Sequence, residues 1–286
     1  GEAFRNVEFV DTISKNMLTG DYCFYNQLTG YAFATDKAVA TDFSQGDSLF
    51  IHADTLQLYT YHVNTDSVYR EARAYHKVRF YRTDLQGVCD SLVFSSKDSC
   101  LTLYQDPILW NGKQQLLGEE IMVYMNDSTI DWAHIQNQAL SVEQLDSLNY
   151  NQVSGKDMKA YFEGGEMKQV DVDGSVRLVY FPMEKDSTLL GMNCSETSKL
   201  SMFLENRKLK KMAMSPKSNG TLYPMTQIPP AKMKLDNFAW FDYIRPLNKE
   251  DIFNWRGKKA GQELKKSTRG AAPKPNQNLF GNDKKE

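Results

Sequence analysis

The sequence lacks the features that mark most nucleic-acid-binding and membrane-spanning chains. Its formal net charge is only −2 over 286 residues, so it has no overall basic field that would attract nucleic acid or an anionic membrane surface. Its longest apolar runs, such as residues 178–182, are far too short to cross a bilayer. We therefore expect no nucleic-acid partner and no transmembrane segment.

Motifs for catalysis and metal binding are also missing. The four histidines stand apart, and the chain contains no H-E-x-x-H, no G-x-S-x-G and no glycine-rich phosphate loop. His52 and Asp54 would share one strand face and could orient an imidazole, but so short a pair is a weak signal. We expect no enzyme, no cofactor and no metal. A carbohydrate-active β-helix would need a cluster of carboxylates on one exposed sheet face.

Cysteine is scarce, and the four cysteines lack the paired C-x-x-C spacing of a zinc or redox site. Cys89 and Cys100 flank the turn SSKD on the same strand face. A tight hairpin would place Cys100 opposite Val93, so the two sulfur atoms would be too far apart for a disulfide unless a bulge shifts the register. Unpaired, buried thiols are therefore the favoured interpretation.

Helical periodicity is almost absent, and alternation of apolar and polar residues takes its place. In residues 76–125 apolar side chains occupy every second position of short runs separated by polar turns, a pattern typical of strands with one buried face. The unit recurs loosely from residue 4 to residue 214, with glycines about 26 to 41 residues apart, at positions 20, 46, 87, 118, 155 and 191. Glycine tolerates positive φ and close backbone approach, so we expect the strands to bend there.

Three segments follow from composition. Residues 1–223 hold the strands, with one short helix predicted over 140–148 behind a Ser141 cap. Residues 224–256 are rich in proline and aromatics, and Asn248 could cap a helix that ends at Trp255. We expect this extension to fold over the end of the sheet or to dock on a partner. Residues 257–286 are polar and rich in lysine, which predicts a disordered basic tail.

Four strings carry a resemblance to a known family. They are A-x-x-x-V-x-F (74–80), G-x-C-D-S-L-x-F (87–94), L-x-L-x-x-D-P-x-L-W (101–110) and Q-L-L-G-E-E-I (115–121). These strings resemble the OstA-like repeats of the LptA family of lipopolysaccharide-transport proteins, and the resemblance covers roughly residues 4–222. The long irregular loops and the extension after Pro224 are similar to a Bacteroidetes-type OstA-like protein.

The resemblance implies an all-β fold, a repeat-built, V-shaped open β-jelly roll in the periplasm, where association with the outer membrane is compatible with the family's role. Its apolar interior would bind the acyl chains of lipopolysaccharide or a related glycolipid. Homologous domains, from further copies or from other transport components, would stack edge to edge and move the lipid toward the outer membrane. The alternative is a structural or adhesive β-repeat module with a filled core and no lipid ligand, because alternation does not distinguish a packed interior from a lipid-filled one.

The candidate groove lining is the inward-facing alternating set of residues 78–132. It comprises Val78, Phe80, Leu92, Phe94, Leu101, Leu103, Ile121, Val123, Ile130 and Trp132.

Overall fold

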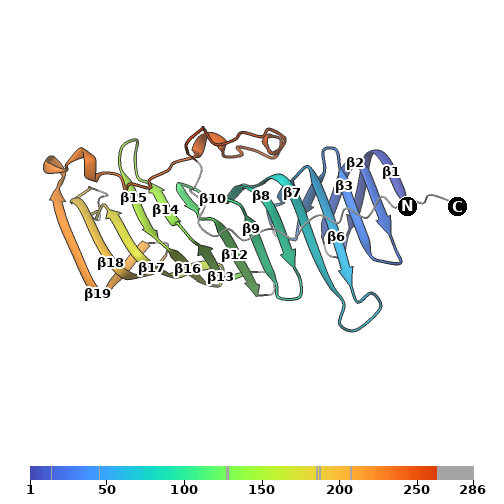
Figure 1. Cartoon of the computed structure of the whole chain (residues 1–286), viewed down its shortest axis with the longest axis horizontal. Coiled ribbons are helices and arrows are strands. Elements are labelled where there is room, and N and C mark those ends of the chain that lie inside the picture. Colours follow the sequence, from blue (N-terminus) through green and yellow to red (C-terminus); the bar gives the residue numbers. More distant parts are fainter. Residues whose placement is uncertain are drawn as a thin grey trace.

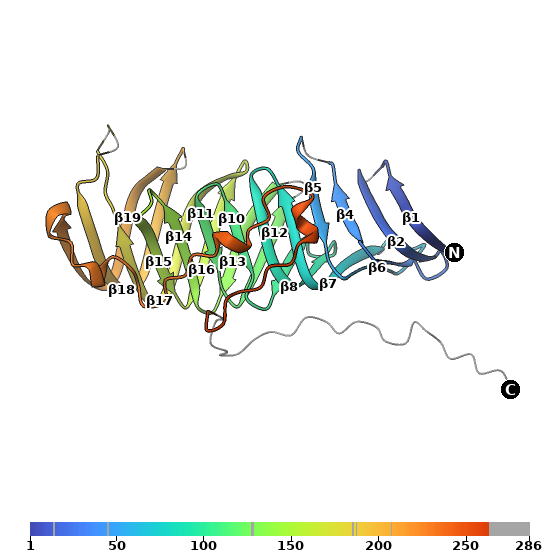
Figure 2. The same cartoon turned by 90° about the horizontal axis from the view of Figure 1, so that it is seen from above.

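The computed structural model describes residues 1–262 except 14, 45, 127–128, 185, 187 and 207. Within these residues the chain forms 19 strands, all paired antiparallel in one continuous sheet, and four short 3-10 turns. Figures 1 and 2 show an elongated array with β1 at one end and β19 at the other. The prediction of an all-β chain is confirmed. Most of the predicted basic tail lies outside the described residues.

The array is folded along its length into two half-sheets, called A and B here. Half-sheet A contains β3 (Tyr31–Thr35), β6 (Thr55–Tyr61), β9 (Cys100–Tyr104), β12 (Glu120–Asn126), β13 (Thr129–Gln136) and β16 (Asp157–Glu163). Half-sheet B contains β4 (Val39–Asp42), β5 (Leu49–His52), β10 (Ile108–Asn111), β11 (Gln114–Leu117), β14 (Ala139–Gln144) and β15 (Tyr150–Gly155).

Seven long strands run through both half-sheets and connect them. They are β1 (Glu2–Asp11), β2 (Asn16–Asn26), β7 (Tyr69–Arg82), β8 (Leu85–Ser95), β17 (Glu166–Tyr180), β18 (Gly191–Glu205) and β19 (Lys208–Pro224). The chain crosses between half-sheets A and B at corners that all lie along one line. The hairpin turns lie at the opposite ends of the strands and form two free edges, one on each half-sheet.

The corners are built by pairs of consecutive residues in the left-handed region. Examples are Asp36–Lys37, with φ of 56° and 60°, and Asn137–Gln138, with φ of 53° and 53°. The glycine at position 118 lies at a corner without a positive φ, but a Cβ there would come within 2.5 Å of a methyl group of Ile135. The predicted bend is present at Gly118, whereas Gly46 lies in the turn between β4 and β5 and Gly191 begins β18, so the bends predicted at these two glycines are wrong. Residues other than glycine supply the left-handed backbone at the corners named here.

The main core fills the space between the half-sheets. Next to the corner line the inward side chains are fully buried, and Val78, Ile121 and Ile135 are each 0% exposed. Farther toward the free edges the inward side chains, such as Leu101 and Ile130, are only half-buried. The interior is thus tightly packed at the corners and becomes accessible toward the edges.

After β19 the chain turns back and runs along the outer surface of half-sheet B (Figures 1 and 2). This segment, residues 228–258, is called the strap, and it includes η2 (Pro230–Lys232), η3 (Asp242–Ile244) and η4 (Asp251–Phe253), whereas η1 (Met225–Gln227) precedes it. Phe241 and Ile244 of the strap pack into a second core on the outer face of B, with Ile108, Trp110 and other outward residues. The extension therefore covers the outer face of B, not the end of the sheet.

Three local predictions need correction. The helix predicted over 140–148 is wrong, because Ala139–Gln144 forms β14, whose Leu140 and Val142 are required in the outer core. The helix predicted from Asn248 is a single 3-10 turn, although the Asn248 side-chain oxygen does accept the Asp251 N–H at 2.8 Å. Cys100 pairs with Ser95 across the hairpin, not with Val93, and all four cysteines are free.

Candidate functional site

Nine of the ten predicted lining residues lie on the two inner walls that face each other. Buried members of the inner core are Val78, Phe80, Leu92, Leu103, Ile121 and Val123, and Leu101 and Ile130 are half-buried against them. Phe94 lies on the same inner face of A, because it pairs directly with Ala72 and Leu101 and alternates with Leu92. The structure therefore brings these side chains onto one continuous apolar surface.

Trp132 does not line this surface. Its indole lies on the outer face of half-sheet A, stacked on Tyr124 with a centroid distance of 4.1 Å and an interplanar angle of 6°. The register between β12 and β13 shifts at this point, because Met125 pairs with Ile130 while Tyr124 pairs with Trp132. This bulge leaves Asp131 as an extra residue and reverses the alternation, so Ile130 points inward and Trp132 outward.

A cleft of about 600 Å³ opens between the half-sheets at the β19 end of the array. This volume falls within the range of small-molecule sites. Its lining includes Tyr180, Asn193, Ser195, Leu209, Met212 and Met214. Sequence reasoning left these residues out of the site, although Met212 and Met214 show the same alternation as the predicted lining.

The two walls of the groove differ in chemistry toward this end. The wall on A is apolar and rich in methionine, with Met167, Met202 and Met212 half-buried against the inner core. The wall on B carries polar pairs: Ser195 donates to Asn193 at 2.8 Å, and the Asn151 amide donates to a carboxylate oxygen of Glu143 at 2.9 Å. One apolar and one polar wall suit a ligand that has both kinds of surface.

Tyr180 adds a neutral hydroxyl to the polar wall. Burial raises the pKa of Tyr180, and the nearby Glu143 carboxylate raises it further. The phenol therefore stays protonated and can donate a hydrogen bond into the cleft. Among the described residues no group of histidine, cysteine and acidic side chains is arranged to hold a metal ion.

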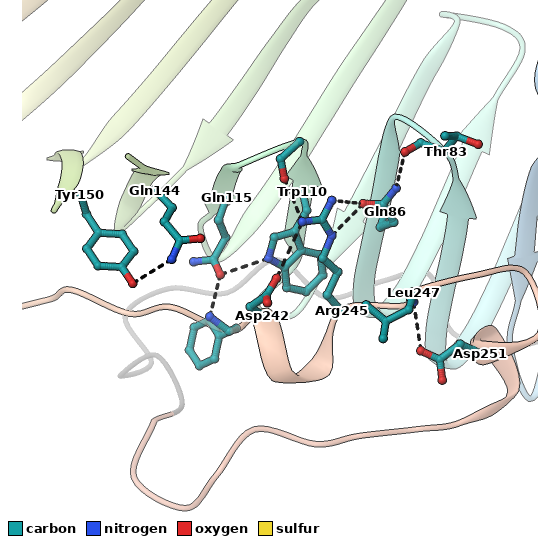
Figure 3. Close-up of polar contacts among 12 residues, drawn as sticks. Thr83, Gln86, Trp110, Gln115, Gln144, Tyr150, Asp242, Arg245, Leu247 and Asp251 are labelled. Carbon is teal, nitrogen blue, oxygen red and sulfur yellow. Dashed lines mark hydrogen bonds and ion pairs between the residues drawn. The ribbon is translucent and has the colours of Figure 1, made fainter. Parts of the chain in front are cut away.

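Two buried glutamines, Gln115 and Gln152, hold the backbone of the strap on the outer face of half-sheet B, and Gln115 is drawn in Figure 3. The amide of Gln115 donates to the Ala239 carbonyl at 2.9 Å and accepts the Phe241 N–H at 2.7 Å. In the same way Gln152 donates to the Met233 carbonyl at 2.8 Å and accepts the Leu235 N–H at 2.9 Å. Each side chain replaces the pairing that a neighbouring strand would give the strap backbone.

Arginines fix the far part of the strap. Arg245 donates from Nε to the Gln86 side-chain oxygen at 2.8 Å and from Nη1 to the Gly112 carbonyl at 2.8 Å (Figure 3). Arg79, which is 3% exposed, donates to the Ile252 carbonyl. Burial lowers the pKa of Arg79 to about 10, so the guanidinium remains charged at neutral pH. The strap is therefore an integral outer layer of half-sheet B.

No known protein family matches the chain, and comparison with curated proteins also gives no match. No helix in the described part of the chain combines the length and apolar character needed to cross a membrane.

Proposed function

We propose that this chain binds the acyl chains of lipopolysaccharide or a related glycolipid between its half-sheets and passes the lipid toward the outer membrane from the periplasm. The observation that carries the proposal is the inner apolar surface, which is packed at the corner line and becomes accessible toward the free edges. If the protein's own side chains filled the space between the half-sheets, the rows of side chains near the free edges would be buried as fully as the rows beside the corner line. Half-buried rows along the groove are apolar surface that an acyl chain would cover.

The cleft at the β19 end supports an amphiphilic ligand. Methionine side chains are unbranched and adapt to irregular apolar partners, so the wall on A can follow acyl chains of different length. The opposite wall offers Asn193, Ser195 and Tyr180 to the hydroxyl, ester and amide groups of a glycolipid. Plain hydrocarbon would cover the Tyr180 hydroxyl and the Asn193 amide N–H groups without offering them a hydrogen bond, at a cost in affinity.

The two ends of the array fit a stacked assembly. Within the described residues β1 pairs only with β2 and β19 only with β18, so each end has an unpaired strand edge. Both strands run from half-sheet A to half-sheet B, so β19 of one domain could pair in parallel with β1 of the next and continue both half-sheets. The partner would be a second copy or a homologous domain.

Charge favours this head-to-tail arrangement over contacts between like ends. The exposed charged side chains on β1 are the acidic Glu2 and Glu8 and one basic residue, Arg5, so this edge has an acidic excess of one. Exposed basic side chains on β19 are Lys208, Lys210, Lys211 and Lys217. Opposite charges attract across such an interface, whereas two β19 edges would repel each other.

The second candidate is a structural or adhesive module with protein partners only. The fully buried row at the corner line, for example Val78 and Ile121, favours it, since that part of the interior has no space for a ligand. The two candidates differ in what contacts the half-buried rows, and that contact can be measured.

Photo-crosslinking from the inner wall separates the candidates. We expect a benzophenone side chain at Phe94 or at Met212 to capture lipopolysaccharide in cells, because both positions face the groove. Tyr161, which is 38% exposed, provides the control position on half-sheet A outside the inner core. If Phe94 and Met212 yield no lipid adduct, the transport function is wrong. Protein adducts alone would favour the adhesive module.

A further inference from the structure

The strap has two sides of different character. Phe241, Ile244 and Ile252 point into the molecule and are at most 4% exposed. Between residues 243 and 255 the strap also exposes large apolar side chains. These are Tyr243, Leu247, Phe253 and Trp255, with exposed fractions of 38%, 68%, 45% and 43%. The inner side accounts for the attachment of the strap, so the exposed set needs a separate explanation.

Lysines accompany these exposed side chains. The described carboxylates of the strap each face a cation, in the pairs Asp236–Arg177, Asp242–Arg245, Glu250–Lys249 and Asp251–Arg256. Two other lysines of this region lie over aromatic rings: the Nζ of Lys234 is 4.7 Å from the ring centroid of Phe238, and that of Lys259 is 4.9 Å from Tyr243. Cationic and aromatic groups therefore alternate along the outer side.

The charge of the strap is opposite to that of the rest of the molecule. The strap, residues 228–258, contains six Lys and Arg against four Asp and Glu, and Lys259 follows it directly, whereas residues 1–223 contain 21 against 29. An anionic surface would attract the strap and repel the net negative charge of residues 1–223, which favours an approach with the strap toward the surface. This orientation brings the exposed aromatic side chains to the contact.

We propose that the outer side of the strap docks on the surface of an anionic lipid bilayer. Tryptophan and tyrosine favour the interface between hydrocarbon and water, and lysines nearby gain from anionic headgroups. The exposed groups follow one extended segment, in which Trp255 also borders a hollow of about 230 Å³ beside Cys89 and Gln105. An extended row of exposed side chains suits a surface more than a single protruding ligand group. The inference concerns the face opposite to the groove and does not depend on the proposed transport function.

Vesicle sedimentation with the full chain tests the docking. We expect binding to vesicles that contain phosphatidylglycerol, and no binding to phosphatidylcholine alone. The double variant Lys234→Ser/Lys259→Ser should bind about 25-fold more weakly, since each lysine near an anionic surface contributes about fivefold. Leu247→Ser should cost about fivefold through lost apolar burial.

Matched controls lie elsewhere on the surface. Lys211→Ser removes a lysine that also lies over an aromatic ring, 5.7 Å from the centroid of Phe203, but on β19. Leu148→Ser removes an aliphatic side chain that is 70% exposed at a free edge. Both control variants should bind like the unmodified protein. Folded protein that ignores anionic vesicles, binds neutral ones equally, or responds equally to control and strap variants overturns the proposal.

Fluorescence gives an independent readout. The indole of Trp255 is half-exposed on the strap, whereas Trp110 is fully buried. Trp132 and Trp240 are half-buried and also contribute to the emission. Docking should shift the Trp255 contribution to shorter wavelength and expose it to quenching by brominated lipid, and Trp255→Phe should remove most of both effects while anionic vesicles are still bound. Unchanged emission on binding would show that the strap does not face the bilayer.

Discussion

Replacing Gln115 by leucine would test how the strap is held on half-sheet B. The Gln115 side chain is 0% exposed, and its amide serves three partners: the Trp110 indole N–H at 3.2 Å (Figure 3), the Ala239 carbonyl and the Phe241 N–H. Leucine is similar in size, so the change removes hydrogen bonds and leaves the packing volume nearly unaltered.

The expected cost follows from the groups left without partners. A buried donor or acceptor without a hydrogen bond costs about 1–3 kcal/mol, and the substitution would leave three such groups. The strap can shift and let water reach its own backbone at Ala239 and Phe241, so the costs will not add in full. We expect a loss of about 3 kcal/mol in the free energy of unfolding, which is a large part of typical domain stability.

Urea unfolding together with hydrogen exchange measures this effect. Exchange should increase at Phe241 and its neighbours in the strap, while the strands of half-sheet A keep their protection. The adjacent substitution Gln114→Leu is a matched control, because Gln114 is half-exposed and its amide makes only a 3.4 Å contact with the Ser141 hydroxyl; it should change stability by less than about 0.5 kcal/mol. A cost below about 1 kcal/mol for Gln115→Leu, with unchanged exchange, would refute the role of the amide.

Three further outcomes follow from single sites. Gly87→Ala should cost about 2 kcal/mol in urea unfolding, because its Cβ would lie 2.1 Å from Cζ of Phe80. Burial alone would raise the pKa of Asp251, but hydrogen bonds from Arg256 and from backbone and side-chain N–H groups hold this pKa below the ordinary 3.8. The ionised carboxylate therefore stabilises the strap above pH 3.8, and this stabilisation is lost as the pH falls through the lower folded-state pKa. Burial raises the pKa of the Cys89 thiol, so alkylation of folded protein followed by peptide mapping should spare Cys89.

Controls make these outcomes decisive. Gly46→Ala should leave the urea midpoint unchanged, because a Cβ there meets no atom within 4 Å, and an equal loss at both glycines would contradict the steric argument. Asp251→Asn should weaken the protection of strap amides from hydrogen exchange at neutral pH and make this protection less dependent on pH in the acid range. If the variant shows the same pH dependence as the unmodified protein, a group other than Asp251 causes the acid transition. Cys194 is half-buried and should be modified before Cys89, and the reverse order would contradict the burial argument.

Alternation by itself determined the strands and most of the inner wall. An apolar residue at every second position of a strand must lie on one face, so Val78, Leu92 and Ile121 could be assigned to the interior without any knowledge of the strand order. The same regularity predicted the repeated unit and the absence of long helices. These properties are local, since they depend only on neighbours along the chain and on the geometry of an extended backbone.

Only the tertiary structure decided the rest. One extra residue at a bulge places Trp132 on the outer face. Residues 139–144, where the sequence predicts a helix, form a strand whose outer face packs against the strap. The first effect depends on the register of β13 against its hairpin partner β12. The second depends on the apolar outer face that Leu140 and Val142 share with the strap, which lies far later in the chain. Alternation assigns a side chain to a face of its strand, but strand register and long-range packing decide what that face contacts.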